Sequence, residues 1–316
     1  MPVPVGRLAP SPTGLLHLGH ARSFLLAWWH VRARGGRIVL RIEDLDGVRA
    51  RPQMVEAALR DLRWLGLDWD GEPWLQSRGM DRIMNALDQI VRQGLAYACV
   101  CSRNDVASAQ NAPQQGDQEP RYPGSCRGRF ASAEDAARET GRPVGLRFRV
   151  PEGAVEFHDG IHGEVSIDVS RQVGDFLIGR RDGAPAYQLA VVVDDAAQGI
   201  TEVMRGDDLL ASTARQWHLQ AALGLPHPSW FHLPLVTDAA GRRLAKRADD
   251  LSLAELAAGG SDPRAVVAWA ARSAGMEVAE RVSAGDALHA FDLRRLPREP
   301  VRLDAATLDA LRAARP

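Results

Sequence analysis

The sequence predicts an α/β protein with a doubly wound parallel sheet, a β-rich insertion and a short C-terminal helical region. Three observations lead to this fold class. Strand and helix patterns alternate over residues 1–98, as in βαβ units. After a run of short strand patterns at residues 144–169, buried-strand and helix patterns return. Beyond residue 253 the chain is rich in Ala, Leu and Arg, broken only by prolines.

Composition excludes several classes of protein. The 316 residues are 45% hydrophobic and 25% charged, which is typical of a globular protein large enough for two domains. No apolar run reaches the ~18 residues of a membrane span, and the first residues lack the basic region of a signal peptide. We therefore expect a cytoplasmic protein. The net charge is −1, so any surface that binds nucleic acid must be local.

The first stretch predicts a strand at residues 3–8, an irregular Pro- and Gly-containing loop, and an amphipathic helix at 21–34. A loop that leads from a strand into a helix N-terminus is a ready anion site. His17 and His20 lie one turn apart at that N-terminus and could contact a triphosphate. For these two residues alone, an ordinary solvated helix start is an equally good interpretation.

Residues 37–46 form a β-branched apolar run that ends in three carboxylates, which predicts a buried parallel strand. Ligands of open α/β sheets lie at the carboxyl ends of strands. Glu43 could therefore bind a substrate ammonium, or it could be a solvated turn residue. Amphipathic helices are expected at 53–65 and 80–91, and a short strand at 97–101.

The second half of the sheet is expected after the β-rich stretch. Residues 184–195 have a buried-strand pattern, 199–208 a second strand with a charged end, and 209–223 a helix. Tyr187 and Arg205 would then lie near the mouth of a pocket, although the residues alone favour an ordinary structural role for each.

Three cysteines cluster in the sequence, Cys99, Cys101 and Cys126. An odd number and a cytosolic context argue against disulfides, and such clusters more often bind metal. Zinc usually has four ligands, and no histidine lies nearby. Tyr122 is the remaining candidate, although a phenolate is an uncommon ligand. Unligated cysteines are the alternative. Residues 104–120 between them are polar and predict a mobile loop.

Of the 39 Lys and Arg residues, one is a lysine, Lys246. Genome composition explains the arginines but not the surviving lysine. A site that needs a compact ammonium group would explain it. Lys246 lies in a basic loop that begins at Gly241 and also contains Arg243, and a solvated basic loop is the alternative.

Together these motifs resemble the class I aminoacyl-tRNA synthetases. Residues 9–20, Ala-Pro-Ser-Pro-Thr-Gly-Leu-Leu-His-Leu-Gly-His, are similar to the HIGH signature of the glutamyl and glutaminyl branch. Arg-Ile-Glu-Asp-Leu-Asp at 41–46 is a second signature of that branch. The loop around Lys246 resembles the KMSKS loop, with Arg243 in place of the first lysine and Ala245 in place of the serine. Cys-x-Cys…Tyr-x3-Cys resembles the zinc knuckle of the small glutamyl-synthetase paralogues.

The resemblance covers residues 7 to about 250 and implies a Rossmann-like catalytic core in two halves. The implied domains are the first half of the core at 1–98, an inserted acceptor-type domain with the zinc knuckle at 99–183, the second half of the core at 184–235, and the KMSKS-like loop with a helical region at 236–316. We expect no anticodon-binding domain.

The resemblance also implies roles for individual residues. ATP, accompanied by Mg²⁺, would be bound by His17, Gly19, His20, Arg243 and Lys246, of which His17, His20 and Lys246 would be catalytic. L-Glutamate would be bound by Arg7, Ala9, Ser11, Glu43, Tyr187 and Arg205. The two arginines suit its carboxylates, because a guanidinium group binds a carboxylate through two parallel hydrogen bonds. One structural Zn²⁺ per chain would be held by Cys99, Cys101, Tyr122 and Cys126.

Within this family the chain is most similar to the truncated branch of glutamyl-Q tRNA(Asp) synthetases. That branch activates glutamate without tRNA and transfers it to the queuosine base at the wobble position of tRNA(Asp). The expected partners are ATP, L-glutamate and queuosine-bearing tRNA(Asp), and we expect a monomer that acts without a membrane. The alternatives are a minimal glutamyl-tRNA synthetase that charges the 3′ end of tRNA(Glu) and a non-catalytic tRNA-binding paralogue, which would not need Lys246. A nucleotidyltransferase with a HIGH motif would lack the 41–46 signature.

Overall fold

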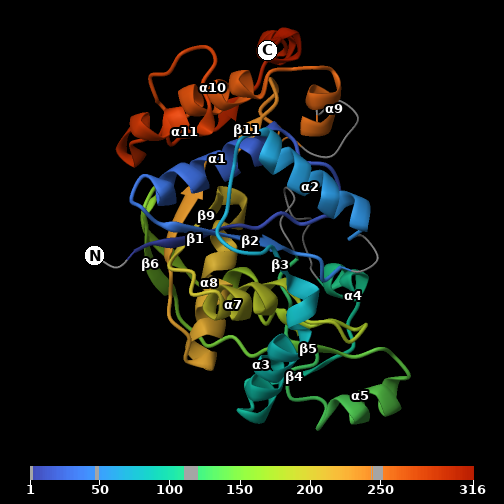
Figure 1. Ribbon diagram of the computed structural model, residues 1–316. Helices are drawn as coiled ribbons and strands as arrows, with labels where there is room; N and C mark the ends of the chain where they lie inside the picture. Colours follow the sequence, from blue (N-terminus) through green and yellow to red (C-terminus); the bar gives the residue numbers. More distant parts are fainter. Residues whose placement is uncertain (1–2, 47–49, 110–119, 243, 245–251) are drawn as a thin grey trace.

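The computed structural model of the chain describes residues 3–46, 50–109, 120–242, 244 and 252–316 (Figure 1). A mostly parallel sheet lies at its centre. Thr201 donates its backbone N–H to the carbonyl of Val5 (2.9 Å) and so joins the two groups of strands that form the sheet. The first group, in order, is β1 (Val5–Leu8), β2 (Arg37–Ile42) and β3 (Trp74–Leu75); the second is β9 (Glu202–Gly206), β10 (Ser229–Leu233), β6 (Val155–Asp159) and β7 (Gly163–Ile167). Within these groups only the β6–β7 hairpin is antiparallel, which confirms the predicted α/β fold class.

Helices cover both faces of the sheet (Figure 1). On one face lie α1 (Leu18–Arg32) and α2 (Pro52–Trp64), with α10 (Pro263–Ser273) packed over α1. On the other face lie α3 (Met80–Arg92), α7 (Tyr187–Ala197) and α8 (Leu210–Leu223), which pack against one another. Each face has its own apolar core, so the sheet separates two hydrophobic layers.

Strand periodicity places charged residues on the α7 face. In β2, Ile38, Leu40 and Ile42 belong to the core beneath α1, whereas Val39 packs against the core on the α7 side. Because side chains alternate along a strand, Arg41 shares the α7 side with Val39. Arg7 of β1 lies opposite Val39 in the parallel register and points the same way. The α7 face of the sheet therefore carries arginines inside the protein.

The strand expected at residues 184–195 is wrong, because this segment forms helix α7. A short run that is apolar on every side suits a buried strand and a buried helix equally well, and periodicity alone cannot separate them. The helix is enclosed by α3, α8 and the sheet, and its residues from Gln188 to Asp195 are buried. This change of element puts a helix, rather than another strand, opposite the arginines.

The inserted region contains a small antiparallel sheet at the end of the molecule away from the C-terminal helices (Figure 1). It consists of β4 (Ala96–Cys99), β5 (Gly145–Phe148) and β8 (Leu177–Gly179), with helices α4 (Arg103–Ser108), α5 (Ala133–Thr140) and α6 (Val169–Gln172) in the same stretch of chain. The β6–β7 hairpin, which the sequence assigned to the insertion, pairs with β10 of the central sheet. The domain boundaries at 98/99, 183/184 and 235/236 stay a prediction.

The C-terminal region packs on α1 and α2 (Figure 1). Its elements are α9 (Leu253–Ala258), α10, α11 (Ala284–Ala287) and α12 (Ala305–Ala313), and its strand β12 (Val301–Arg302) pairs with β11 (Val236–Thr237). Short 3₁₀ turns lie at Gln76–Gly79, Asp207–Leu209, Leu288–Ala290 and Leu293–Arg295. Over the part of the chain described, no helix has both the length and the apolar character needed to cross a membrane.

Candidate active site

Two histidines form the N-terminus of α1 through reciprocal hydrogen bonds. His17 is the N-cap residue, and its Nδ1 accepts from the N–H of Gly19 (3.1 Å). Nδ1 of His20 accepts from the N–H of His17 (3.2 Å), and the two ring centroids lie 3.8 Å apart. Because both Nδ1 atoms accept, the proton of each neutral ring is on Nε2. A Cβ at Gly19 would lie 3.0 Å from the His17 ring, so glycine allows this close approach.

The predicted phosphate-binding residues Arg243 and Lys246 lie outside the described residues. Further along the chain, Ser252 forms a bridge with His17, and Leu253 donates its N–H to the carbonyl of Leu16 (2.8 Å). The chain that leaves the KMSKS-like stretch is thus attached to the turn that carries the two histidines.

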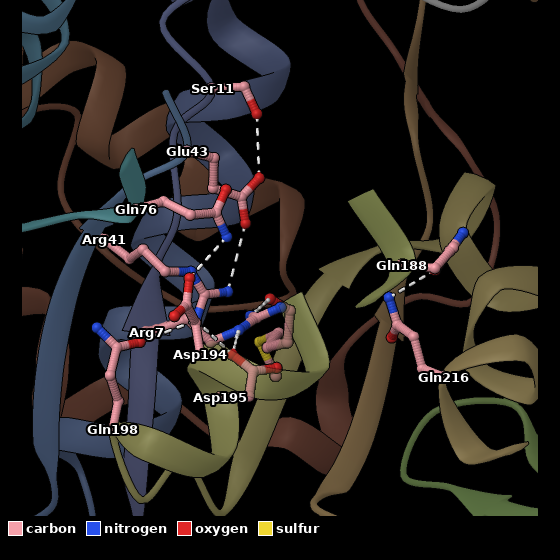
Figure 2. A network of polar contacts seen from close by, with 11 residues as sticks. Arg7, Ser11, Arg41, Glu43, Gln76, Gln188, Asp194, Asp195, Gln198 and Gln216 are labelled. Atoms are coloured by element: carbon pink, nitrogen blue, oxygen red, sulfur yellow. Dashed lines mark hydrogen bonds and ion pairs between the residues drawn. The ribbon is translucent and has the colours of Figure 1, made fainter. Parts of the chain in front are cut away.

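A chain of polar contacts runs from the exposed Ser11 of the N-terminal loop through the buried Arg41 to α7 (Figure 2). Ser11 Oγ donates to one oxygen of Glu43 (3.1 Å), and Arg41 donates to the other (3.3 Å). Arg41 also donates to Asp195 (2.6 Å) and to the side-chain oxygen of Gln198 (2.8 Å). Glu43 is thereby held at the carboxyl end of β2, as the sequence predicted, by Ser11, a predicted site residue, and by Arg41, which the sequence did not identify as one.

Arg41 and Asp195 are site residues that sequence reasoning missed. Arg41 is fully buried, and although burial disfavours its charge, Asp195 and Glu43 keep its pKa above the usual range. A buried charge needs a partner. The available signal was a charged residue in the middle of a strand that is otherwise apolar, which requires a carboxylate on whatever element covers that face.

Two further arginines lie inside the same face, each with only 6% of its surface exposed. Arg7 donates from Nη1 to the carbonyl of Met204 (3.2 Å), and its Nε lies 3.6 Å from Asp195. Arg205 makes no ion pair within the described part of the chain. Burial lowers the pKa of Arg205, and the positive charge of Arg7 adds to this.

Each of these arginines has one N–H donor without a hydrogen-bond partner in the described part of the chain. Among the described residues, Arg7 Nε and Arg205 Nη1 are buried without a hydrogen-bond partner. Leaving a buried donor unsatisfied is costly, and two neighbouring positive charges repel each other. An anionic ligand with carboxylate groups would satisfy both donors and remove the repulsion.

Tyr187, the first residue of α7, lies beside these charges. Burial raises the pKa of its phenol, and Glu43 adds to this, whereas Arg205 and Arg7 oppose it. Nevertheless 41% of its surface is exposed. Tyr187 is therefore an accessible residue at the edge of this group of charges. The next residue, Gln188, accepts from Gln216 of α8 (2.9 Å; Figure 2), which holds the start of α7.

The structure therefore brings most of the predicted glutamate-binding residues together. Four of them influence one another electrostatically, and a fifth is hydrogen-bonded to that group: Arg7, Glu43, Tyr187, Arg205 and Ser11. Ala9 is half-buried in the loop between Arg7 and Ser11. Their roles toward a substrate stay a prediction.

The three cysteines also converge. Their Sγ atoms all lie within 4.8 Å of one another, with Cys101 and Cys126 3.5 Å apart. The Tyr122 hydroxyl lies 3.5 Å from the sulfur of Cys99 and 4.0 Å from that of Cys101. Tetrahedral zinc with bonds of about 2.3 Å to sulfur separates its ligands by roughly 3.8 Å, so this donor set fits the ion. Burial and the neighbouring Cys99 raise the pKa of the Cys101 thiol to about 12, which a divalent cation would reverse.

An arginine supports this cluster from the adjacent strand. Arg147 of β5 donates from Nε to Cys99 Sγ (3.2 Å), and its guanidinium lies 3.7 Å above the ring of Tyr122. Tyr122 accepts the N–H of Cys126 (2.8 Å). The positive charge would offset part of the negative charge of several thiolates around one metal ion.

Comparison with known proteins agrees with this site. Residues 4–309 match the catalytic domain of the class I tRNA synthetases (E and Q). The chain is 46% identical to a glutamyl-Q tRNA(Asp) synthetase from Symbiobacterium thermophilum, over 97% of this chain and 98% of that protein. The chain belongs to the glutamyl-Q tRNA(Asp) synthetase family. A second member, from Rhodopirellula baltica, is 42% identical over 95% of this chain and 96% of its own length.

A longer relative has the same fold over nearly all of this chain. A glutamate–tRNA synthetase from Elizabethkingia anophelis, known from a crystal structure, superimposes with a TM-score of 0.80 at 25% identity, over 98% of this chain and 69% of that one. As a member of the glutamyl-Q tRNA(Asp) synthetases, the chain is a ligase with a class I catalytic domain, which implies ATP and Mg²⁺ as its nucleotide and metal. The recognition from sequence motifs is thereby confirmed.

Proposed function

We propose that this chain activates L-glutamate with ATP, without tRNA, and transfers the glutamyl group to the queuosine base at the wobble position of tRNA(Asp). The observation that carries the first half is the pair of buried guanidinium groups, Arg7 and Arg205, each with an unsatisfied N–H. The names of relatives that are 46% and 42% identical over nearly their whole length support the second half.

The substrate-binding roles follow from charge. Arg7 and Arg205 suit the carboxylates of a dicarboxylic amino acid, because guanidinium binds carboxylate through two parallel hydrogen bonds. Glu43, held by Ser11 and Arg41, offers a carboxylate to the substrate ammonium. Tyr187 lines the accessible side. An amino acid with an uncharged side chain would leave one guanidinium group without a carboxylate partner. The site therefore selects glutamate over neutral amino acids.

The chemistry consists of two displacements. A carboxylate oxygen of glutamate attacks the α-phosphorus of ATP, the bond to the β-phosphate breaks, and pyrophosphate leaves. A hydroxyl of queuosine then attacks the acyl carbon, an ester forms, and AMP leaves. The protein contributes position and charge. His17 and His20 would donate from Nε2 at the positive end of α1, and Lys246 with Arg243 would neutralise the phosphates as pyrophosphate departs.

The acceptor is tested with labelled glutamate and tRNA from cells that make queuosine and from cells that do not. We expect ATP–pyrophosphate exchange with glutamate alone, and label that requires queuosine and survives trimming of the tRNA 3′ end. Label on tRNA(Glu) that is lost on trimming would identify a glutamyl-tRNA synthetase that charges the 3′ end. Absence of exchange with every amino acid would identify a non-catalytic tRNA-binding paralogue.

Zinc is the proposed structural ion of the inserted region, held by Cys99, Cys101, Cys126 and Tyr122. We expect Cys126→Ser to lose bound zinc and to lower the thermal stability of the insertion, because structural zinc contributes directly to folding. Metal analysis and thermal unfolding measure the two effects. Ser102→Ala removes the N-cap of α4 and leaves the sulfurs in place, so this control should keep its zinc. A parent protein with well under one zinc per chain would contradict the assignment.

A further inference from the structure

A buried histidine lies directly behind Arg205. His232 of β10 and Asp159 of β6 have fully buried side chains, and His232 Nδ1 lies 2.6 Å from an oxygen of Asp159. On the opposite side of the ring, Nε2 lies 3.1 Å from Nε of Arg205 and 3.1 Å from the hydroxyl of Thr213. Three elements of the sheet and helix α8 thus meet at one imidazole.

The hydrogen bonds determine which ring nitrogen carries the proton. The second oxygen of Asp159 accepts backbone N–H groups from Ile161 and His162 (3.0 Å each), so this carboxylate acts as an acceptor throughout. Nδ1 of His232 must therefore donate to Asp159. Nε2 is then an acceptor, which is what the N–H of Arg205 requires. Burial lowers the pKa of His232 to about 4, so the ring is neutral at neutral pH.

We propose that Asp159 and His232 are positioning residues that hold Arg205 through a neutral acceptor and so keep its full positive charge for the carboxylate of glutamate. This inference rests on the proposed function. His232 fixes Nε of Arg205, and Thr213 fixes Nη2 (2.8 Å), which leaves Nη1 as the donor without a partner. The guanidinium is thereby oriented before the substrate arrives.

Arg41 on the same face shows the contrast. It is bonded to Asp195 and Glu43, so its charge is neutralised inside the protein. A carboxylate behind Arg205 would do the same and would weaken its attraction for a substrate anion. Asp159 instead acts through the imidazole: it sets the proton on Nδ1 without touching the guanidinium. The charge of Arg41 is therefore neutralised within the fold, whereas that of Arg205 has no carboxylate partner among the described residues.

The test uses two substitutions of His232 that each keep one of its contacts. His232→Asn reproduces the Nδ1 donor to Asp159 but removes the acceptor of Arg205, whereas His232→Gln places an amide oxygen near the position of Nε2. In ATP–pyrophosphate exchange we expect His232→Asn to raise the KM for glutamate about 10- to 100-fold, the usual effect of losing a hydrogen bond to a charged group. The KM for ATP should stay within twofold, and His232→Gln should recover most of the glutamate affinity.

A second buried histidine supplies the matched control. His30 of α1 has its Nε2 2.7 Å from the carboxylate of Glu202 of β9, and Glu202 points to the face of the sheet opposite Arg205 because the two are three residues apart in the strand. His30→Gln should lower thermal stability without changing the KM for glutamate. Thermal unfolding first shows whether the His232→Asn variant is folded. The inference is overturned if the folded variant has the KM of the parent for glutamate, or if His30→Gln raises this KM by the same factor. If the parent shows no glutamate-dependent exchange, the proposed function itself fails, and this inference with it. If the parent activates glutamate but Arg205→Ala leaves the KM for glutamate unchanged, this inference alone fails.

Discussion

Replacing Arg205 with alanine is expected to lower the kcat/KM for glutamate activation by a factor on the order of 10²–10³ and to leave the KM for ATP nearly unchanged. The reason is that a carboxylate taken into a buried site without its charged partner loses several kcal/mol, about 3–5 in comparable buried pairs. Arg7→Ala should act in the same direction, since its Nε is also a buried donor that has no hydrogen-bond partner among the described residues. ATP–pyrophosphate exchange at varied glutamate and ATP measures both effects.

Two comparisons sharpen this result. Arg205→Lys keeps the charge but loses the planar fork and the contact with His232, so its activity should fall between those of the parent and the alanine variant. Arg264→Ala removes a half-exposed arginine that pairs with Asp262 on α10, far from the sheet face, and should leave the glutamate KM at the parental value. If Arg7→Ala and Arg205→Ala both activate glutamate normally, the pocket has been assigned to the wrong residues.

Lys246→Ala is expected to lower the rate of adenylate formation by about 10²–10³ and to leave the fold intact. Losing one preorganised contact to developing phosphate charge typically has this effect. Lys246 is assigned this role because it is the single lysine of the chain and lies in a KMSKS-like stretch. That stretch leads into Ser252, which forms a bridge with His17. Single-turnover adenylate formation, with circular dichroism as the test of folding, measures the outcome.

Lys246→Arg tells whether charge alone suffices. An ammonium is a compact point charge, whereas guanidinium is planar and larger, so we expect only partial recovery. Arg247→Ala, at the next position, is the control for a general change in the charge of the loop. An exchange rate of Lys246→Ala within a few-fold of the parent would remove its assigned role, and Arg243 would become the candidate.

The sequence by itself determined those parts of the site that depend on local spacing. His17 and His20 are one helical turn apart, so any helix starting there brings their rings together, and the structure places them 3.8 Å apart. Glu43 follows an apolar strand, so it lies at a carboxyl edge wherever that strand packs. Cys99 and Cys101 lie two residues apart, and their shared metal-binding chemistry made Cys126 the expected third member.

Only the tertiary structure decided which groups hold the arginines. Arg41 meets Asp195 across 154 residues, and Arg205 meets His232 across 27. Neither pairing leaves a periodic signal, because it depends on which element covers the sheet face. The apolar run 184–195 was compatible with a strand, and its folding into α7 is what places Asp195 beside Arg41. The roles of Arg41 and Arg205 diverge for the same reason: identical side chains on one face acquire a charged or a neutral partner only when distant segments pack together.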